Sequence, residues 1–234
     1  MSPQEVISLI KDENISIIRL WFTDILGQIR GFAITPLELP DAMESGMGFD
    51  GSSVEGFARI EESDLVALPD PETLKILPEE VGGYKSAIMF CDLQTPEGEP
   101  FEGDTRYVLR RNLKKIAEQG YTFYIGPELE FFYFNDDRSP CCLDEGGYFD
   151  ASIVNQGTFL RNRTIEVLDQ LGILVEYSHH EVAPSQHEID LRYSDALTMA
   201  DAAVTYKMVV KEIAQKQGIH ATFMPKPIGG VCGS

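Results

Sequence analysis

Acidic side chains gather in one segment, residues 176–193, and they are the first candidates for chemistry in this sequence. The segment contains four acidic residues and three of the chain's four histidines. A Pro-Ser-Gln turn at 184–186 divides it, and the residues on either side predict two paired strands. Glu181 and Glu188 would then face each other across a hairpin. Because neighbouring carboxylates repel each other at neutral pH, a bound cation would relieve the repulsion.

A solvated polar surface is the competing interpretation of this hairpin. Polar and apolar residues alternate after the turn, which sends Ile189 and Leu191 to a buried face. The same alternation sends Glu188, Asp190 and Arg192 to the opposite face. For the hairpin taken alone, charges exposed to water are a better interpretation than a metal site.

A second pair of carboxylates, Glu128 and Glu130, lies on a long strand predicted at 121–134, with a bend at Gly126-Pro127. Residues two apart on a strand project from the same face. The aromatic residues around the pair make uncompensated charges costly there. A solvated strand rim and a cation site explain this pair equally well.

The two pairs together strengthen the case for a cation. All four candidate ligands are carboxylates and no cysteine accompanies them, which favours a hard divalent ion, Mg²⁺ or Mn²⁺. We therefore predict a metal site that handles phosphate, formed by Glu128, Glu130, Glu181 and Glu188. The phosphate-binding motif GxxxxGK[ST] and the nucleophile motif Gly-x-Ser-x-Gly are both absent from the sequence.

Composition restricts the classes of function. With 38 acidic against 19 basic residues, the chain of 234 residues has a net charge of −19, so neither nucleic acid nor an anionic membrane is an expected partner. No apolar run could span a bilayer, and the N-terminus is not a signal peptide. The four cysteines form no CxxC pair, which indicates a reducing, cytoplasmic location.

Local patterns predict an α+β chain with a linker at 95–103. The glycine-rich stretch 46–53 and its continuation to residue 64 are predicted as a surface loop, in which Asp50 has a capping or turn role. We expect His220 to be structural, and His179 and His187 to orient neighbours or lie at the surface. Helices are predicted after Ser2 and at 35–46, 104–120, 156–171 and 194–217, with Asp104 and Ser194 as the caps of the two helices that they begin. The helix that Asp104 begins is predicted to turn an apolar face inward, formed by Tyr107, Val108, Leu109, Leu113 and Ile116. Strands are predicted at 15–22, 28–34, 86–93, 121–134 and 219–225, and a hairpin at 173–193.

Four motifs, in order along the chain, resemble those of a known family. They are residues 49–53, 126–131, 180–188, and 224–227 with the following 233–234. Together they resemble glutamine synthetase over nearly the whole chain, and the pattern is most similar to the bacterial and archaeal type I enzymes.

The resemblance implies a small β-grasp domain at 1–98 and the N-terminal part of a catalytic α+β domain at 104–234. It implies ATP-dependent amidation of glutamate with ammonia through γ-glutamyl phosphate. It also implies ATP, glutamate and ammonium as ligands, Mg²⁺ or Mn²⁺ as cofactor, and a homo-oligomeric ring, a dodecamer in this family.

The resemblance also assigns roles to residues. Glu130, Glu181 and Glu188 would hold one divalent ion, and Glu128 would help to hold a second ion that bridges phosphate. The remaining assignments are Glu176 and Tyr193 as nucleotide contacts, Asp50 as an ammonium-binding aspartate donated across a subunit interface, Tyr148 near the substrate pocket, and Gly233 on the glutamate loop.

The chain departs from the family pattern near residue 234. The family continues with Gly-Met-His-x-His, and it prefers Phe at the position of Gly229 and Asn at that of Cys232. We therefore expect this chain alone not to synthesise glutamine at a useful rate. The alternatives are a non-enzymatic truncated homologue that binds metal or acts as a regulatory subunit, and a ligase of the same fold that joins glutamate to another amine.

Overall fold

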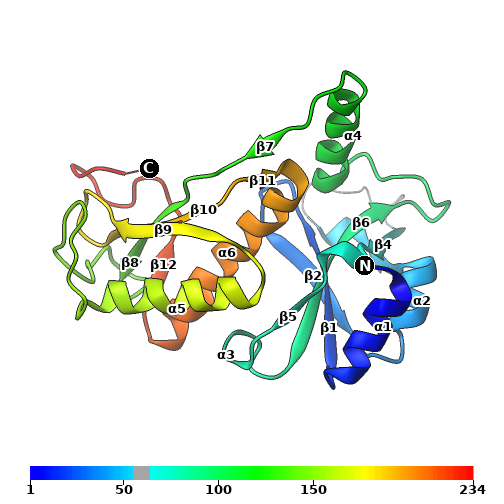
Figure 1. Ribbon diagram of the computed structural model, residues 1–234, viewed down its shortest axis with the longest axis horizontal. Coiled ribbons are helices and arrows are strands. Elements are labelled where there is room, and N and C mark those ends of the chain that lie inside the picture. Colours follow the sequence, from blue (N-terminus) through cyan, green and yellow to red (C-terminus); the bar gives the residue numbers. More distant parts are fainter. Residues whose placement is uncertain (55–63, 234) are drawn as a thin grey trace. The chain divides into compact units, whose positions relative to one another are not determined.

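The computed structural model of the chain describes residues 1–54 and 64–233, and it divides into two compact units (Figure 1). Unit 1 is Met1–Phe123 and unit 2 is Tyr124–Ser234. The predicted continuation of the glycine-rich loop through 55–63 lies outside the described residues. The predicted domain ranges, 1–98 and 104–234, stay a prediction.

A six-stranded sheet forms the centre of unit 1, with the order β2-β1-β6-β4-β3 and with β5 paired to β6. The neighbours β1 and β6 are parallel. Ile18, Leu20 and Phe22 alternate along β1 and are buried, as a strand with one face on the core requires. The strands are β1 Ile17–Thr23, β2 Ile29–Ile34, β3 Met47–Asp50, β4 Asp64–Pro69, β5 Lys75–Leu77 and β6 Ser86–Gln94.

Capping residues define the helices of unit 1. Helix α1, Pro3–Asp12, begins with a capping box in which Ser2 and Glu5 bond each other's backbone N–H groups. Helix α4, Thr105–Ala117, begins at the predicted cap Asp104, whose carboxylate accepts from the Arg106 N–H at 3.0 Å. The other helical segments are α2 Leu39–Ser45, α3 Glu79–Gly82 and the short 3-10 turns η1 Gly51–Ser53 and η3 Pro71–Thr73.

Two local predictions for unit 1 are wrong. The glycine-rich stretch 46–53 is not loop throughout, because it forms β3, which pairs with β4, and then η1. Residues 46–51 spell GxGxxG, but they form this strand and its ends rather than the strand–loop–helix unit that binds dinucleotides. The predicted apolar face of α4 is only half-buried: Val108 is exposed, and the buried side chain of this helix is Arg106.

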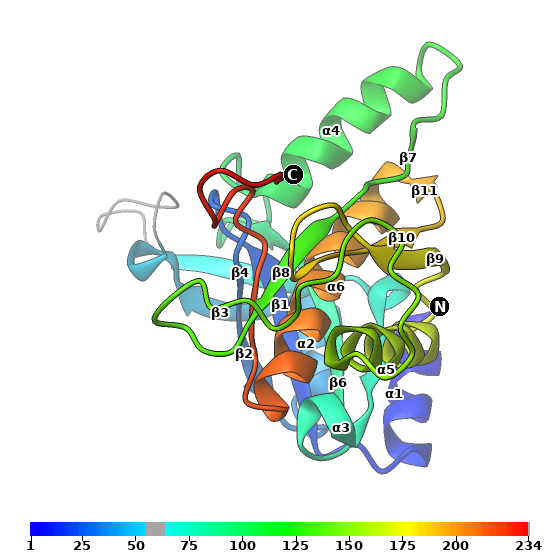
Figure 2. The ribbon, with the colours of Figure 1, turned by 90° about the vertical axis from the view of Figure 1, so that its left-hand side faces the viewer.

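Unit 2 is built on a four-stranded antiparallel sheet with the order β12-β8-β10-β9. Helices α5 and α6 pack against each other and against this sheet (Figures 1 and 2). A second, two-stranded sheet pairs β7 with β11. The elements are β7 Tyr124–Ile125, β8 Glu130–Phe134, α5 Gln156–Gln170, β9 Val175–His180, β10 Gln186–Leu191, β11 Ser194–Asp195, α6 Ala196–Lys216 and β12 His220–Thr222.

The predicted hairpin is confirmed, since β9 and β10 pair antiparallel around the turn. The long strand predicted at 121–134 is wrong: β7 and β8 belong to different sheets, and the chain between them is irregular. The last helix is capped by Asp195 rather than by the predicted Ser194, and its carboxylate accepts from the Thr198 N–H at 3.1 Å. Over the residues described, no helix combines the length and apolar character that crossing a membrane requires.

Candidate functional site

Strand β10 places Glu188 among the other acidic residues, because β10 lies between β8 and β9. Glu188 pairs with Glu130 of β8 on one side and with His179 of β9 on the other. Glu181 follows the last residue of β9, and its N–H donates to the Gln186 carbonyl at 2.7 Å. The predicted facing of Glu181 and Glu188 is therefore wrong as a strand register, because His179 is the cross-strand partner of Glu188.

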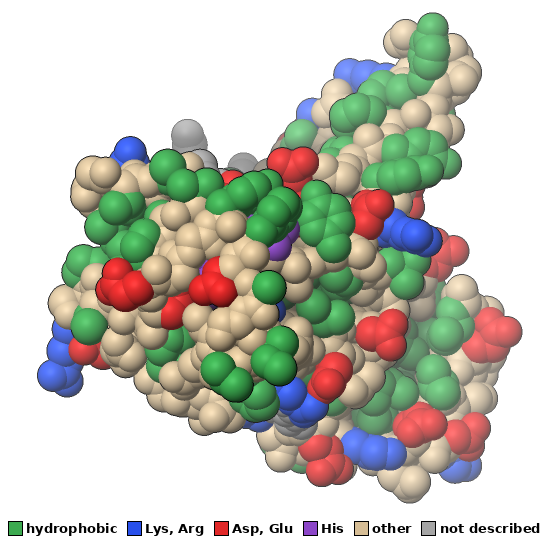
Figure 3. All heavy atoms as spheres, turned by 60° about the vertical axis from the view of Figure 1, so that its left-hand side comes forward, with side chains coloured by type: hydrophobic (Ala, Val, Ile, Leu, Met, Phe, Trp, Pro, Cys, Tyr) green, Lys and Arg blue, Asp and Glu red, His purple; other side chains and the backbone are tan. Residues whose placement is uncertain are grey.

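The carboxylates of Glu130, Glu181 and Glu188 nevertheless converge. Each offers one oxygen, and these oxygens lie within 4.8 Å of one another. We call these three residues the glutamate site. The side chains of Glu181 and Glu188 are only 12% and 8% exposed, so the solvated face expected for the hairpin alone is wrong. Figure 3 shows one face of the molecule, on which only small parts of histidine side chains reach the surface, among hydrophobic and acidic side chains.

Burial and mutual repulsion raise the proton affinity of the glutamate site. Burial, followed by the nearby carboxylates of Asp190 and Glu130, raises the pKa of Glu188 to about 8. Burial and then Glu181 raise the pKa of Glu130, although a hydrogen bond from Gln186 lowers it in part. Each shift means that the ionised site is less stable than separate carboxylates in water, so a positive ligand would be favoured.

Two further side chains, His179 and Asp190, border the glutamate site. His179 Nε2 lies 3.1 Å from Glu188 Oε2 and 3.8 Å from Asp190 Oδ2, and His179 Nδ1 lies 3.4 Å from Glu181 Oε1. Burial also raises the pKa of Asp190. The imidazole therefore lies among three carboxylates, and the sequence alone did not place His179 or Asp190 in the predicted site.

A hard divalent cation fits this donor set. Within the described ranges, Glu188 Oε1 and Asp190 Oδ2 are buried oxygens that no hydrogen bond satisfies. Leaving such an oxygen unpaired is costly, and a coordinated ion removes that cost. Carboxylate oxygens are the ligands that Mg²⁺ and Mn²⁺ prefer, so Glu130, Glu181 and Glu188 are the residues that could hold such an ion.

Glu128 lies outside the strand that was predicted to carry it. Strand β7 ends at Ile125 and β8 begins at Glu130, so Gly126-Pro127 separates two strands instead of bending one. Glu128 is exposed, but its charge contributes to the raised pKa values of Glu130 and Glu188. It is therefore close enough to the glutamate site to act on it electrostatically.

Tyr148 lies beside His179, which borders the glutamate site. Its ring stacks on Phe149 with centroids 4.0 Å apart and meets the His179 ring edge to face at 5.6 Å. Glu176 on β9 and Tyr193 after β10 are exposed, and neither is among the side chains that contact the glutamate site.

The two remaining predicted residues lie in other surroundings. Asp50 belongs to unit 1, where its carboxylate accepts from the N–H and hydroxyl of Ser52 at 2.9 and 2.7 Å, which is the capping role that its local sequence predicts. Gly233 lies where a Cβ atom would be 2.3 Å from the Pro225 carbonyl oxygen, so the backbone approach there requires glycine.

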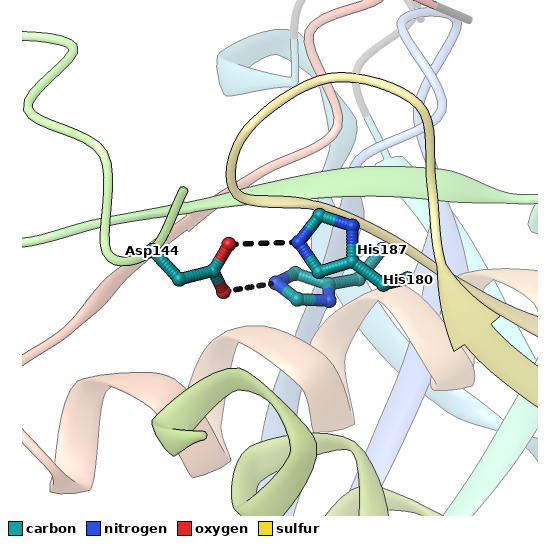
Figure 4. A group of neighbouring side chains, drawn as sticks. All are labelled: Asp144, His180 and His187. Carbon is teal, nitrogen blue, oxygen red and sulfur yellow. Dashed lines mark hydrogen bonds and ion pairs between the residues drawn. The ribbon is translucent and has the colours of Figure 1, made fainter. Parts of the chain in front are cut away.

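Sequence reasoning missed a buried cluster beside the glutamate site (Figure 4). Asp144 Oδ1 lies 2.7 Å from His180 Nε2, and Asp144 Oδ2 lies 3.3 Å from His187 Nε2. We call these three residues the Asp–His cluster. Arg161 of α5 donates to His187 Nδ1 at 2.5 Å, so the hydrogen of His187 is on Nε2 and faces Asp144.

The charges of the Asp–His cluster follow from its hydrogen bonds. His180 Nδ1 faces the Glu181 carbonyl at 2.6 Å and Nε2 faces Asp144; because both partners are acceptors, both nitrogens carry hydrogen. Burial opposes this charge, but Asp144 outweighs it and the pKa of His180 is raised. Burial likewise opposes ionisation of Asp144, yet the two histidines hold its pKa well below the ordinary value. Burial lowers the pKa of His187 to about 4.

Comparison with known proteins identifies the family to which this fold belongs. Residues 14–96 match the glutamine synthetase β-grasp domain, and residues 102–234 match the glutamine synthetase catalytic domain. These matches define a protein of mixed helices and sheets with a β-grasp N-terminal domain followed by a catalytic domain. The chain belongs to the glutamine synthetase family.

Individual relatives show the extent of the similarity. The chain is 50% identical over 235 residues to a glutamine synthetase of Mycolicibacterium smegmatis, covering 98% of this chain and 53% of that protein. It is 49% identical over 238 residues to one of Thermotoga maritima, covering 100% and 54%. The chain therefore spans about half the length of the curated relatives it matches.

Solved structures are similar in backbone. A structure described as a GmaS/ADP complex has a TM-score of 0.88 and 28% identity, covering 98% of this chain and 53% of that chain. A cryo-EM structure of Plasmodium falciparum glutamine synthetase has a TM-score of 0.87 and 28% identity, covering 97% and 51%.

Proposed function

We propose that this chain supplies metal-binding residues for the glutamate–ammonia ligase reaction, the ATP-dependent amidation of glutamate with ammonia through γ-glutamyl phosphate. The observation that supports the proposal is the convergence of Glu130, Glu181 and Glu188 within 4.8 Å. The identity of about half to curated glutamine synthetases supports the choice of this reaction over other metal-dependent chemistry.

In this proposal the glutamate site holds one divalent ion, Mg²⁺ or Mn²⁺, and Glu128 helps to hold a second. Such an ion neutralises charge on a transferring phosphoryl group. Glu130 and Glu188 are fixed by the paired strands β8 and β10, and Glu181 is fixed by its backbone bond to Gln186. The largely buried position keeps water away from the ligand oxygens, which strengthens their attraction to a cation.

The remaining assignments rest on the family and on single contacts. Glu176 and Tyr193 are proposed nucleotide contacts, and a similar solved structure is described as a complex with ADP. Tyr148, in contact with His179, is proposed to line the substrate pocket, and Gly233 to form part of the glutamate loop. Asp50 is proposed to bind ammonium across a subunit interface of a homo-oligomeric ring in the cytoplasm.

Titration with Mn²⁺ tests the metal site in the chain as it stands. We expect the melting temperature to rise with Mn²⁺ and to saturate, because an ion that binds only the folded state stabilises it by about 2.7 kcal/mol at a hundred times its dissociation constant. Substitution Glu188→Gln should abolish this response. The melting temperature is measured at constant ionic strength, with free Mn²⁺ quantified in parallel by electron paramagnetic resonance.

Glu166→Gln is the matched control for this titration. Glu166 is an exposed glutamate on α5 that contacts Arg163, so its loss should leave the Mn²⁺ response intact. A wild-type chain that binds no Mn²⁺, or a Glu188→Gln variant that binds it as tightly as wild type, would refute the proposed site.

A further inference from the structure

The carboxylate of Asp144 links two separate segments of unit 2. Its Oδ1 atom accepts from the N–H of Gly146 at 3.2 Å and from the N–H of Ser185 at 3.1 Å, in addition to His180. Its other oxygen faces His187. One side chain from the loop that precedes α5 therefore holds three residues of the β9–β10 hairpin, His180, Ser185 and His187.

The turn of the hairpin depends on this attachment. Ser185 has a φ of 60°, a left-handed conformation that is unfavourable for residues other than glycine. The N–H groups of Leu143 and Asp144 both donate to the Ser185 hydroxyl oxygen, at 2.5 and 3.0 Å. The same loop thus fixes the Ser185 backbone through the Asp144 carboxylate and the Ser185 side chain through two amides.

Each of the three hairpin residues that Asp144 holds is linked closely to one residue of the glutamate site. His180 immediately precedes Glu181, and His187 immediately precedes Glu188. Ser185 immediately precedes Gln186, whose side-chain amide donates to the Glu130 carboxylate. Glu181 and Glu188 therefore each follow directly after a residue that Asp144 holds. Glu130 is linked to the third such residue, Ser185, through the hydrogen bond from Gln186.

Two glycines pack closely against the Asp–His cluster. A Cβ atom at Gly146 would lie 2.6 Å from His180 Nε2, and a Cβ atom at Gly157 would lie 2.7 Å from His187 Nε2. The side chain of His187 is fully buried and that of His180 is 2% exposed. The ligand atoms of Asp144, His180 and His187 lie close enough together to hold a metal ion, but the 2.7 Å hydrogen bond between Asp144 and His180 and the close packing of the glycines favour a supporting role.

We propose that Asp144 is a positioning residue for the glutamate site. Its carboxylate holds His180, His187 and the Ser185 backbone, and its own N–H holds the Ser185 hydroxyl. This inference rests on the proposed function, because it assigns Asp144 a role only if Glu130, Glu181 and Glu188 bind a cation. Asp144 itself does not touch the ion.

The test measures Mn²⁺ binding by the purified chain, using the metal alone and electron paramagnetic resonance of free Mn²⁺. Substitution Asp144→Asn keeps the shape of the side chain but replaces one acceptor oxygen by an amide nitrogen. Residues that orient metal ligands typically contribute about 10-fold to 100-fold in affinity, so we expect the Mn²⁺ dissociation constant of Asp144→Asn to rise at least about tenfold. Asp136→Asn is the control, because the Asp136 carboxylate accepts from backbone N–H groups of its own turn, at Arg138 and Ser139.

A second variant separates positioning from folding stability. Ser185→Gly removes the hydroxyl that Leu143 and Asp144 bond, but glycine adopts the left-handed conformation without strain, so the variant should remain folded. We expect its Mn²⁺ affinity to fall while its melting temperature without metal stays close to that of wild type.

Three results would overturn the inference. If wild type binds Mn²⁺ and Asp144→Asn binds it with the same dissociation constant, Asp144 has no positioning role, even if the variant melts at a lower temperature. If Asp144→Asn does not fold, an unchanged affinity in Ser185→Gly refutes the role. If wild type binds no Mn²⁺, the glutamate site is refuted and the role of Asp144 with it.

Discussion

Single residues in the two units satisfy buried charge in different ways. In unit 1, the carboxylates of Asp70 and Asp92 contact the Arg106 guanidinium at 2.8 and 2.6 Å, so opposite charges within the protein compensate each other. In the part of unit 2 that the structure describes, the ion pairs of the glutamate site involve only a histidine, His179. The carboxylates of Asp70 and Asp92 thus have an arginine partner, whereas among the described residues the three carboxylates of the glutamate site do not.

The Asp70–Arg106 pair should make unit 1 sensitive to acid. Burial opposes ionisation of Asp70, but Arg106 outweighs it and holds the pKa of Asp70 below its ordinary value. As the pH falls below about 4, the unfolded chain takes up a proton at this carboxyl before the folded unit does, so the stabilisation is lost. Asp70→Asn should therefore destabilise unit 1 by about 1–2 kcal/mol at pH 7, and the difference from wild type should shrink towards pH 3.

Urea unfolding followed by Trp21 fluorescence measures this effect. Trp21 is the chain's single tryptophan and lies on β1, where its ring meets Phe90 edge to face at 5.9 Å, so it reports unit 1. Asp12→Asn, at the exposed end of α1, is the control and should change stability by less than about 0.5 kcal/mol. A difference between Asp70→Asn and wild type that does not vary from pH 7 to pH 3 would contradict the assignment.

At the scale of elements, the sequence predicts what local signals specify. The cap at Asp104, the helix at 156–171 and the hairpin around 184–186 are confirmed, because caps, helical periodicity and turns act over a few residues. The pairing of Glu188 with Glu130 joins residues far apart in the chain, and no local pattern encodes it. Asp144 was missed for the same reason, since it lies 41 residues before Ser185 in a loop without periodicity.

Packing between elements makes a test possible at Gly157 in the first turn of α5. Alanine is the better helix former by about 1 kcal/mol, but the added Cβ would lie 2.6 Å from His187 Cε1. Because His187 is fully buried and held by Arg161, it cannot move aside easily. We expect Gly157→Ala to destabilise the chain by about 1–3 kcal/mol, measured by urea unfolding with far-ultraviolet circular dichroism.

Gly147→Ala is the matched control for that substitution. A Cβ atom at Gly147 would meet nothing within 4 Å, so this variant should unfold close to the wild-type urea midpoint. Stabilisation by Gly157→Ala would show that helix propensity outweighs the contact with His187, and the close packing against the Asp–His cluster would then be wrong.

At the scale of the whole molecule, net charge and local charge act together. The chain carries −19 at neutral pH, so the glutamate site lies in a negative background that opposes ionisation of its carboxylates. That background attracts divalent cations towards the surface before any specific contact forms. The negative side chains also repel one another in the folded state. This repulsion lowers the free energy of unfolding, and salt should reduce the repulsion.

Salt should therefore stabilise the folded chain at pH 7 and lose this effect near its isoelectric point. The Debye length falls from about 30 Å at 0.01 M to about 8 Å at 0.15 M, which screens repulsion between distant carboxylates. We expect the melting temperature in EDTA to rise when NaCl increases over this range at pH 7, and to change little near pH 4.5, where the net charge of this sequence approaches zero. Choline chloride at equal ionic strength is the control, because screening depends on ionic strength and not on a coordinating cation. A stabilisation that appears with NaCl but not with choline chloride would show specific cation binding, and one of equal size at both pH values would contradict self-repulsion as its cause.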